Sequence, residues 1–222
     1  MSNVKWKTLI ITSLLCLAPI LVGIYYYNDL PNMVAIHFNF KGQPDSYIPK
    51  NIFIFLLPVL IAFMQALVCY QNDVVNKGLK TPRVEYIFKS ILPITCVIVY
   101  LLSVGISMGA KLDLRRIMLA FLGILFILIG NYMPKTSGNY RTKVMLNGNL
   151  IGLGYFKKYY NMDPDERKKH YTVFGYLLFV IGIIYLITIF LNEWISMFVV
   201  TGTILLMVIY SIWIFVKVSR NS

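Results

Sequence analysis

Six apolar segments of about 20 residues each run through the 222-residue chain and constrain its fold more than any other feature. The hydrocarbon core of a bilayer is about 30 Å thick, so a helix needs about 20 apolar residues to cross it. None of the segments alternates apolar and polar residues as a barrel strand does, so all six are predicted to be helices. They comprise residues 8–27, 51–70, 87–108, 117–133, 172–191 and 194–216.

The composition agrees with a membrane protein. Hydrophobic residues make up 58% of the chain, charged residues 14%, and the mean hydropathy is +0.70, all far from the values of soluble globular proteins. The chain is therefore predicted to be an all-α integral membrane protein with six transmembrane helices. The first apolar segment is too long for a signal peptide and has no small-residue cleavage site, so we expect it to stay as a helix.

The basic residues indicate how the helices are oriented. A net charge of +12 could suggest a nucleic-acid partner, but lysine and arginine lie in the loops around the apolar segments. With a cytoplasmic N-terminus, sixteen of the 21 lie on the cytoplasmic side, as the positive-inside rule requires. We therefore expect both termini in the cytoplasm and segment 30–50 outside. The partner of this charge is expected to be the lipid bilayer, with no direct nucleic acid.

This topology predicts three regions along the chain. They are a four-helix membrane region at 1–133 that carries the outward loop 30–50, a basic cytoplasmic loop at 134–171, and a C-terminal helical hairpin at 172–222. A helix start is expected within the basic loop. Asp163 suits the N-cap, Pro164 the first helical position, and Glu166 the acidic position of a capping box. The fifth helix should therefore begin before its apolar segment does.

The outward loop, LPNMVAIHFNFKGQPDSYIPK, is too particular in sequence for a passive linker. Its residues 34–41 alternate in polarity, which predicts an extended segment with two faces. The predicted apolar face holds Val34, Ile36, Phe38 and Phe40, and the predicted polar face holds Ala35, His37, Asn39 and Lys41. A turn is expected from Gly42 to Asp45, where glycine can take a positive φ. Since an isolated hairpin is marginal in water, this one should be supported by the helices.

The chain offers little of the chemistry that enzymes and pumps use. No apolar segment has a charged residue or histidine near its centre, which disfavours an ion-coupled transporter. The two histidines are expected on opposite sides of the membrane, so they predict no shared metal site within one subunit. Cys16, Cys69 and Cys96 lie in apolar segments and should behave as small hydrophobes. No catalytic residue, metal or cofactor is predicted, although an acid–base pair of His37 and Asp45 stays an alternative.

Two motifs carry a family resemblance. The first comprises ten loop residues, Leu30, Pro31, Val34, His37, Phe38, Asn39, Gly42, Pro44, Asp45 and Lys50; the second is GNYMPK at 130–135, with Asn131, Tyr132, Pro134 and Lys135. The first resembles the signature LPxxVPxHFNxxGxPDxxxxK of a bacterial membrane domain that forms the N-terminal part of the SdpI-like immunity proteins. The second is similar to the motif after that family's fourth helix. The chain departs from the pattern at Ala35, where the family prefers proline, and lacks the GIRTPW segment expected after the second motif.

The resemblance implies a protein of the bacterial plasma membrane that protects a Gram-positive cell from a secreted peptide toxin. Some members also hold a transcriptional repressor at the membrane. The candidate residues for recognising a toxin outside are His37, Asn39, Gly42, Pro44, Asp45 and Lys50, and GNYMPK is the inner motif. A repressor would be the partner inside, and a homo-oligomer is left open. Two alternatives stand beside this hypothesis: a membrane enzyme or transporter acting on a lipid or an amphipathic peptide, and a structural membrane protein whose loop only aids folding.

Overall fold

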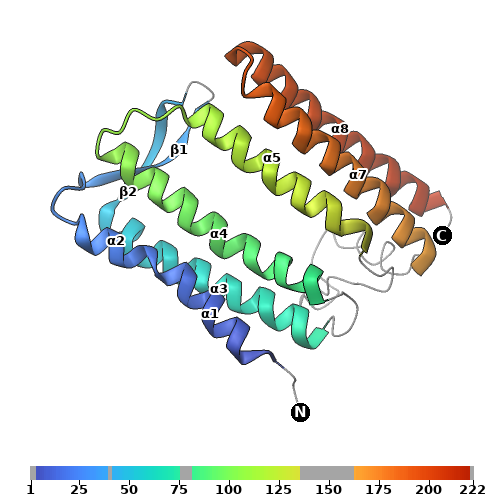
Figure 1. The fold of residues 1–222 in the computed structure, drawn as a ribbon, viewed down its shortest axis with the longest axis horizontal. Coiled ribbons are helices and arrows are strands. Elements are labelled where there is room, and N and C mark those ends of the chain that lie inside the picture. The colour runs from blue at the N-terminus through green and yellow to red at the C-terminus, as the bar shows by residue number, and fades with distance from the viewer. Residues whose placement is uncertain (1–3, 40–41, 76–81, 136–162, 221–222) are drawn as a thin grey trace. The chain divides into compact units, whose positions relative to one another are not determined.

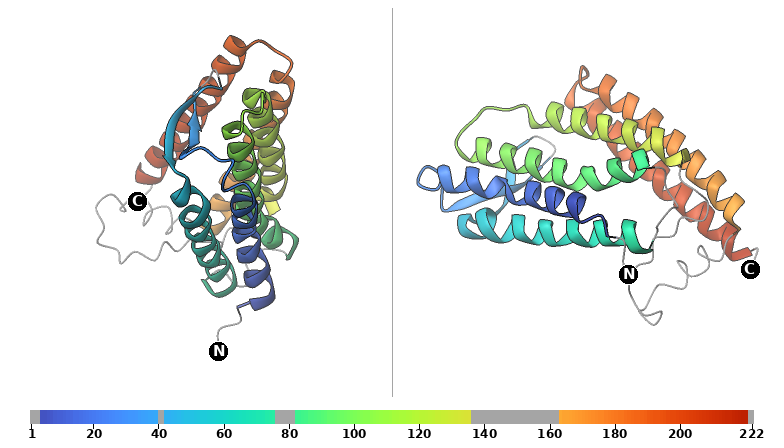
Figure 2. Two further views of the ribbon diagram at one scale, coloured as in Figure 1. Left: turned by 90° about the vertical axis from the view of Figure 1, so that its left-hand side faces the viewer. Right: turned by 60° about the horizontal axis from the view of Figure 1, so that its bottom comes forward.

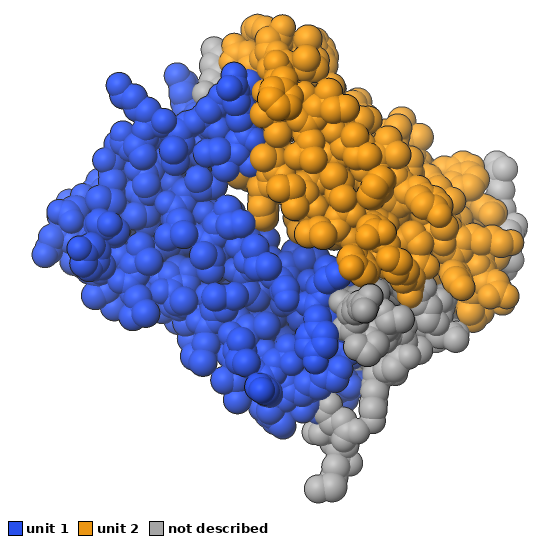
Figure 3. Space-filling model, viewed as in Figure 1, with its two compact units in different colours: residues 1–77, 85–117 blue, residues 78–84, 118–222 orange. Residues whose placement is uncertain are grey.

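A computed structural model describes residues 4–39, 42–75, 82–135 and 163–220 of the chain (Figure 1, with two further views in Figure 2). Within these ranges six helical segments are long and apolar enough to cross a membrane, which confirms the predicted all-α membrane fold. The chain forms two compact units, coloured separately in Figure 3. Unit 1 comprises residues 1–77 and 85–117, and unit 2 comprises residues 78–84 and 118–222.

The first span of unit 1 is interrupted, and the second is continuous but changes helix type along its length. The first consists of α1 (Trp6–Leu17) and α2 (Pro19–Tyr25), which meet where Pro19 lacks the N–H that a continuous helix would use. The second consists of a π-helical segment η1 (Ile52–Leu56), the helix α3 (Leu57–Tyr70) and a second π-helical segment η2 (Gln71–Val75). In Figures 1 and 2, α1 and α3 lie side by side.

The third span, α4, covers Pro82–Ser107 and begins before the predicted boundary at 87. Pro82 is the first residue of this helix. Proline is well tolerated there, because the first N–H groups of a helix have no partner within it. The helix therefore includes Glu85 and places Lys89 inside the span that runs from Glu85 to Ser107.

The outward loop forms an antiparallel hairpin of β1 (Met33–Phe38) and β2 (Pro44–Pro49). Its predicted two-faced alternation is wrong: Val34 and Ala35 are both buried, whereas Ile36 is 39% exposed. The pairing register shifts between Ala35 and His37, so Ile36 has no partner across the strands. Such a bulge takes Ile36 out of the strict period of two, so that Ile36 and His37 are both exposed. Phe40 and Lys41 lie outside the described residues.

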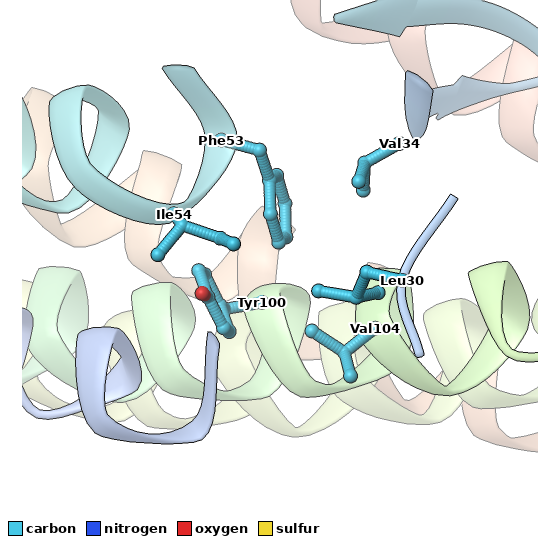
Figure 4. Packing of buried hydrophobic residues seen from close by; sticks show 6 residues of the cluster. All are labelled: Leu30, Val34, Phe53, Ile54, Tyr100 and Val104. Atoms are coloured by element: carbon cyan, nitrogen blue, oxygen red, sulfur yellow. The ribbon is translucent and has the colours of Figure 1, made fainter. Parts of the chain in front are cut away.

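The hairpin is supported by an apolar cluster within unit 1, as expected. Figure 4 shows the six side chains of this cluster pointing toward one another. They are Leu30 and Val34 from the hairpin segment, Phe53 and Ile54 from η1, and Tyr100 and Val104 from α4. The rings of Phe53 and Tyr100 stack with centroids 4.4 Å apart. This hairpin core fixes the loop to two of the spans.

The hydroxyl of Tyr100 is buried in this core, and among the described residues it has no hydrogen-bond partner. A buried polar group without a partner costs about 1–3 kcal/mol, whereas phenylalanine keeps the stacked ring. We therefore expect Tyr100→Phe to leave stability unchanged or to raise it by about 1 kcal/mol. Thermal unfolding in detergent checks this, with Tyr47→Phe on the exposed face of β2 as the control. A clear loss of stability on Tyr100→Phe would mean that the hydroxyl is bonded.

Unit 2 consists of most of α5 (Leu114–Tyr132), a short turn η3 (Met133–Lys135), α7 (Pro164–Thr188) and α8 (Glu193–Arg220). The predicted helix start is confirmed, since the Asp163 carboxylate accepts hydrogen bonds from the backbone N–H of Asp165 at 2.9 Å and of Glu166 at 3.4 Å. Most of the predicted basic loop, residues 136–162, lies outside the described residues.

Glycines bring α5 and α7 into backbone contact. A Cβ on Gly130 would lie 2.5 Å from the Phe179 backbone nitrogen, and a Cβ on Gly182 would lie 2.6 Å from the Gly123 carbonyl oxygen. The facing pairs are Gly123 with Gly182 and Gly130 with Gly175, seven residues apart on each helix. Small residues at this spacing allow close helix packing in membranes.

Candidate functional site

Two residues of the first motif shape the hairpin turn. The Asn39 backbone N–H donates to the Gln43 carbonyl at 2.9 Å, and the Gln43 backbone N–H donates to Asn39 Oδ1 at 3.0 Å. Gly42 donates its N–H to the Asn39 carbonyl at 2.9 Å and has a φ of +73°. Residues other than glycine rarely adopt this φ. The structure thus assigns a folding role to Asn39 and Gly42.

Lys50 ties the end of the hairpin to the segment after α2. Its Nζ donates to the Tyr27 carbonyl at 3.2 Å and lies 4.5 Å from the centre of the Tyr27 ring, a cation–π arrangement. The Tyr27 hydroxyl in turn donates to Asn51 Oδ1 at 2.7 Å. Lys50 is therefore engaged within the fold, whereas Pro44, the first residue of β2, is exposed.

His37 and Asp45 of the first motif are both exposed and contact each other. His37 Nδ1 lies 2.5 Å from Asp45 Oδ1, and the side chains are 68% and 42% exposed. A carboxylate on Nδ1 fixes the orientation of the imidazole ring and leaves Nε2 toward solvent. The pair can offer hydrogen bonds and charge to a ligand. Among the described residues, no group of three His, Cys, Asp or Glu side chains could hold a metal ion.

The inner motif packs helices rather than forming a polar site. A Cβ on Gly175 would lie 2.7 Å from Pro134 Cδ and 2.9 Å from the Gly130 carbonyl oxygen. Lys135 Nζ lies 4.5 Å from the centre of the Tyr132 ring. Asn131 is exposed. Gly130 and Pro134 of the motif therefore enclose Gly175 within unit 2.

A buried cluster of charges, which the sequence reasoning missed, lies within unit 1 at the end opposite the hairpin. Lys89 and Asp73 both have fully buried side chains, and Lys89 Nζ lies 2.5 Å from Asp73 Oδ1 and 2.6 Å from Glu85 Oε1. Lys5 Nζ lies 2.8 Å from Glu85 Oε2, and the Lys5 backbone N–H donates to Asp73 Oδ2 at 3.0 Å. We call Lys5, Asp73, Glu85 and Lys89 the charge clasp.

The charge clasp joins three elements. Lys5 precedes α1, Asp73 belongs to η2, and Glu85 with Lys89 begins the span in α4. Gln65, in the middle of α3, makes a further contact with α4, because its Nε2 donates to the Lys89 carbonyl oxygen at 2.8 Å. The expected role of these basic residues was topology and lipid contact. A Glu–Lys pair four residues apart, with the lysine inside an apolar run, was the signal that could have found the clasp.

Comparison with known proteins identifies one domain. Residues 14–62 match the family model described as a domain of unknown function (DUF1648), which is the N-terminal domain in SdpI-like proteins. The match covers the second half of the first span, the whole hairpin and the start of the second span. No curated protein and no solved structure was found to match the chain.

Proposed function

We propose that this chain is a membrane immunity or sensor protein of a bacterium, which recognises a secreted antimicrobial peptide through the hairpin. The observation that carries the proposal is the placement of His37 and Asp45. Other residues of the motif have roles within the fold: Leu30 and Val34 are in the hairpin core, Asn39 and Gly42 form the turn, and Lys50 binds Tyr27. His37 and Asp45 are exposed and bound to each other. Exposed polar residues without a packing role are suited to binding.

The DUF1648 match at residues 14–62 supports the same proposal, because that domain occurs at the N-terminus of SdpI-like proteins. We further propose that both termini are cytoplasmic and that the hairpin faces outward. The excess of lysine and arginine in the loops assigned to the cytoplasm supports this orientation. A cytoplasmic repressor would then meet the inner loops, as the resemblance implies.

The direct test is survival of a toxin-sensitive Gram-positive strain that expresses wild-type protein, His37→Ala or Asp45→Ala. We expect each variant to lower the highest toxin concentration that the cells survive about tenfold or more, since a central contact is worth about 2 kcal/mol. Their stability should change by at most about 1 kcal/mol, because the ion pair is exposed. Ser46→Ala is the matched control: Ser46 is exposed, pairs with His37 across the hairpin, and is not in the motif.

The outcomes separate the functions. Equal survival of vector, variants and wild type under every candidate toxin would refute immunity. A loss of thermal stability and expression on His37→Ala, with no selective loss of protection, would favour a structural protein. The buried Lys89 and Asp73 give a specific reason to test transport as well, because ionisable groups inside spans often mark substrate or ion pathways. If uptake of a lipid or an amphipathic peptide into liposomes required Lys89 or His37, transport would become the leading hypothesis.

A further inference from the structure

We propose that α3 couples the hairpin core to the charge clasp, so that a ligand on the hairpin releases Lys5 at the opposite end of unit 1. This inference rests on the proposed sensor function and adds how the signal crosses the membrane. It is carried by the contacts at the two ends of one span, by the two π-helical segments there, and by the unequal burial of the two lysines in the clasp.

One continuous helical span makes the contacts at both ends. At the hairpin end, Phe53 and Ile54 of η1 are 2% and 0% exposed and pack in the hairpin core with Val34. At the other end, Asp73 of η2 holds both Lys89 and the backbone of Lys5. A shift of this span is therefore felt by both sites, because it supplies residues to each of them.

The π-helical segments give the span room to shift. A π-helical turn holds one residue more than an α-helical turn and commonly marks a functional place in a helix. Here η1 and η2 lie directly at the two ends of α3. Tightening one segment while the other widens would move or rotate α3 and carry Asp73 of η2 with it. Such a two-state element is what physical coupling between distant sites requires.

Gln65, in the middle of α3, has a hydrogen-bond acceptor that a second position of the helix could satisfy. Its side chain is fully buried, and its Oε1 has no hydrogen-bond partner among the described residues, while Nε2 binds the Lys89 carbonyl. A buried acceptor without a partner is costly. A shift of α3 against α4 changes which atoms this oxygen faces. The unpaired acceptor therefore destabilises the present position of α3 relative to one in which it finds a donor.

The clasp is built to release one lysine and keep the other. Lys89 is fully buried and contacts both carboxylates, so both acids retain a partner if Lys5 leaves. The Lys5 side chain is 44% exposed and is held by Glu85. Exposed pairs are worth little, whereas a broken buried pair is expensive. Movement of Asp73 would therefore free the N-terminal segment first.

The test measures accessibility at the clasp without any toxin. Val4→Cys is introduced into the full chain in lipid nanodiscs, which expose both faces, and its reaction with a hydrophilic maleimide is timed. Cys16, Cys69 and Cys96 are 0%, 0% and 6% exposed, and the protein without Val4→Cys gives their background. Glu85→Gln, which removes the negative charge that holds the Lys5 side chain, gives a reference rate for a weakened clasp.

Phe53→Leu perturbs the hairpin core through η1, and Val104→Ala perturbs the same core through α4. We expect Phe53→Leu to raise the labelling rate at least threefold over wild type, and Val104→Ala to leave it near wild type at an equal or larger loss of thermal stability. Ile54→Val replaces Phe53→Leu if that variant does not insert. Equal rates for the η1 and α4 variants, or wild-type rates for both, would overturn the coupling. Because no toxin is used, failure here leaves the survival assay of His37→Ala to judge recognition separately.

Discussion

Replacing Lys89 with methionine is expected to lower the free energy of unfolding by about 3–5 kcal/mol. Methionine has a similar length, so the packing volume is nearly kept while the positive charge is lost. Asp73 would then remain fully buried without its counter-ion, although its Oδ2 would still accept the hydrogen bond from the Lys5 backbone N–H. A buried carboxylate without its counter-ion is far more expensive than the pair. Thermal unfolding in detergent, followed by circular dichroism, should show a melting temperature about 10 °C lower.

Two controls give this result its meaning. Arg116→Met removes the charge that pairs with Asp113 at 3.0 Å, but those side chains are 60% and 49% exposed, so the loss should stay below about 1 kcal/mol. The double variant Lys89→Met with Asp73→Leu should recover much of the loss, because apolar side chains can replace a buried pair. If Lys89→Met costs no more than Arg116→Met, the clasp is open to water and is not a buried pair.

The clasp also shows why the sequence predicted spans well and their contacts poorly. Apolar length alone predicts a membrane helix, so all six segments were found. Lys89 was counted among loop charges because a lysine near the end of an apolar run can reach the headgroups equally well. What buries it is Asp73, sixteen residues earlier in the chain and on another helix. That pairing depends on how α3 and α4 pack, which neither periodicity nor composition encodes.

The local predictions divide in the same way. The Asp163 cap was predictable because its partners are two and three residues away. The strand alternation of 34–41 was not, because a bulge leaves Ile36 exposed, while Ala35 is buried on the face that was predicted to be polar. The positive φ of Gly42 followed from its residue type alone. Prediction therefore succeeded where the cause is short in sequence and failed where tertiary packing decides.

The candidate site was predicted as a set of residues but not as a set of roles. Six loop residues were expected to recognise a ligand, and the structure gives Asn39, Gly42 and Lys50 contacts that the hairpin itself needs. His37 and Asp45 are left as the exposed pair. A motif read from sequence combines residues that build a surface with residues that use it, and only contacts tell them apart.

Replacing Gly130 with leucine is expected to cost about 3 kcal/mol or more, the upper end of overpacking effects. Even a Cβ at this position would lie 2.5 Å from the Phe179 nitrogen and 2.6 Å from the Gly175 carbonyl oxygen, both backbone atoms of α7. Backbone atoms cannot turn aside as a side chain can, so α5 and α7 would have to separate. Gly130→Ala should already be destabilising, although alanine is the better helix former by about 1 kcal/mol.

Gly202 on α8 provides the matched control, because a Cβ there meets nothing within 4 Å. The free energies of unfolding of Gly202→Leu and Gly202→Ala should lie within about 1 kcal/mol of the wild-type value. The comparison holds residue type, helix setting and added volume constant and varies only what the new atoms meet. Similar melting temperatures for Gly130→Leu and Gly202→Leu would show that α5 and α7 are not in backbone contact. A large difference would identify Gly130 of the inner motif as a packing residue, whatever the neighbouring Asn131 and Lys135 bind.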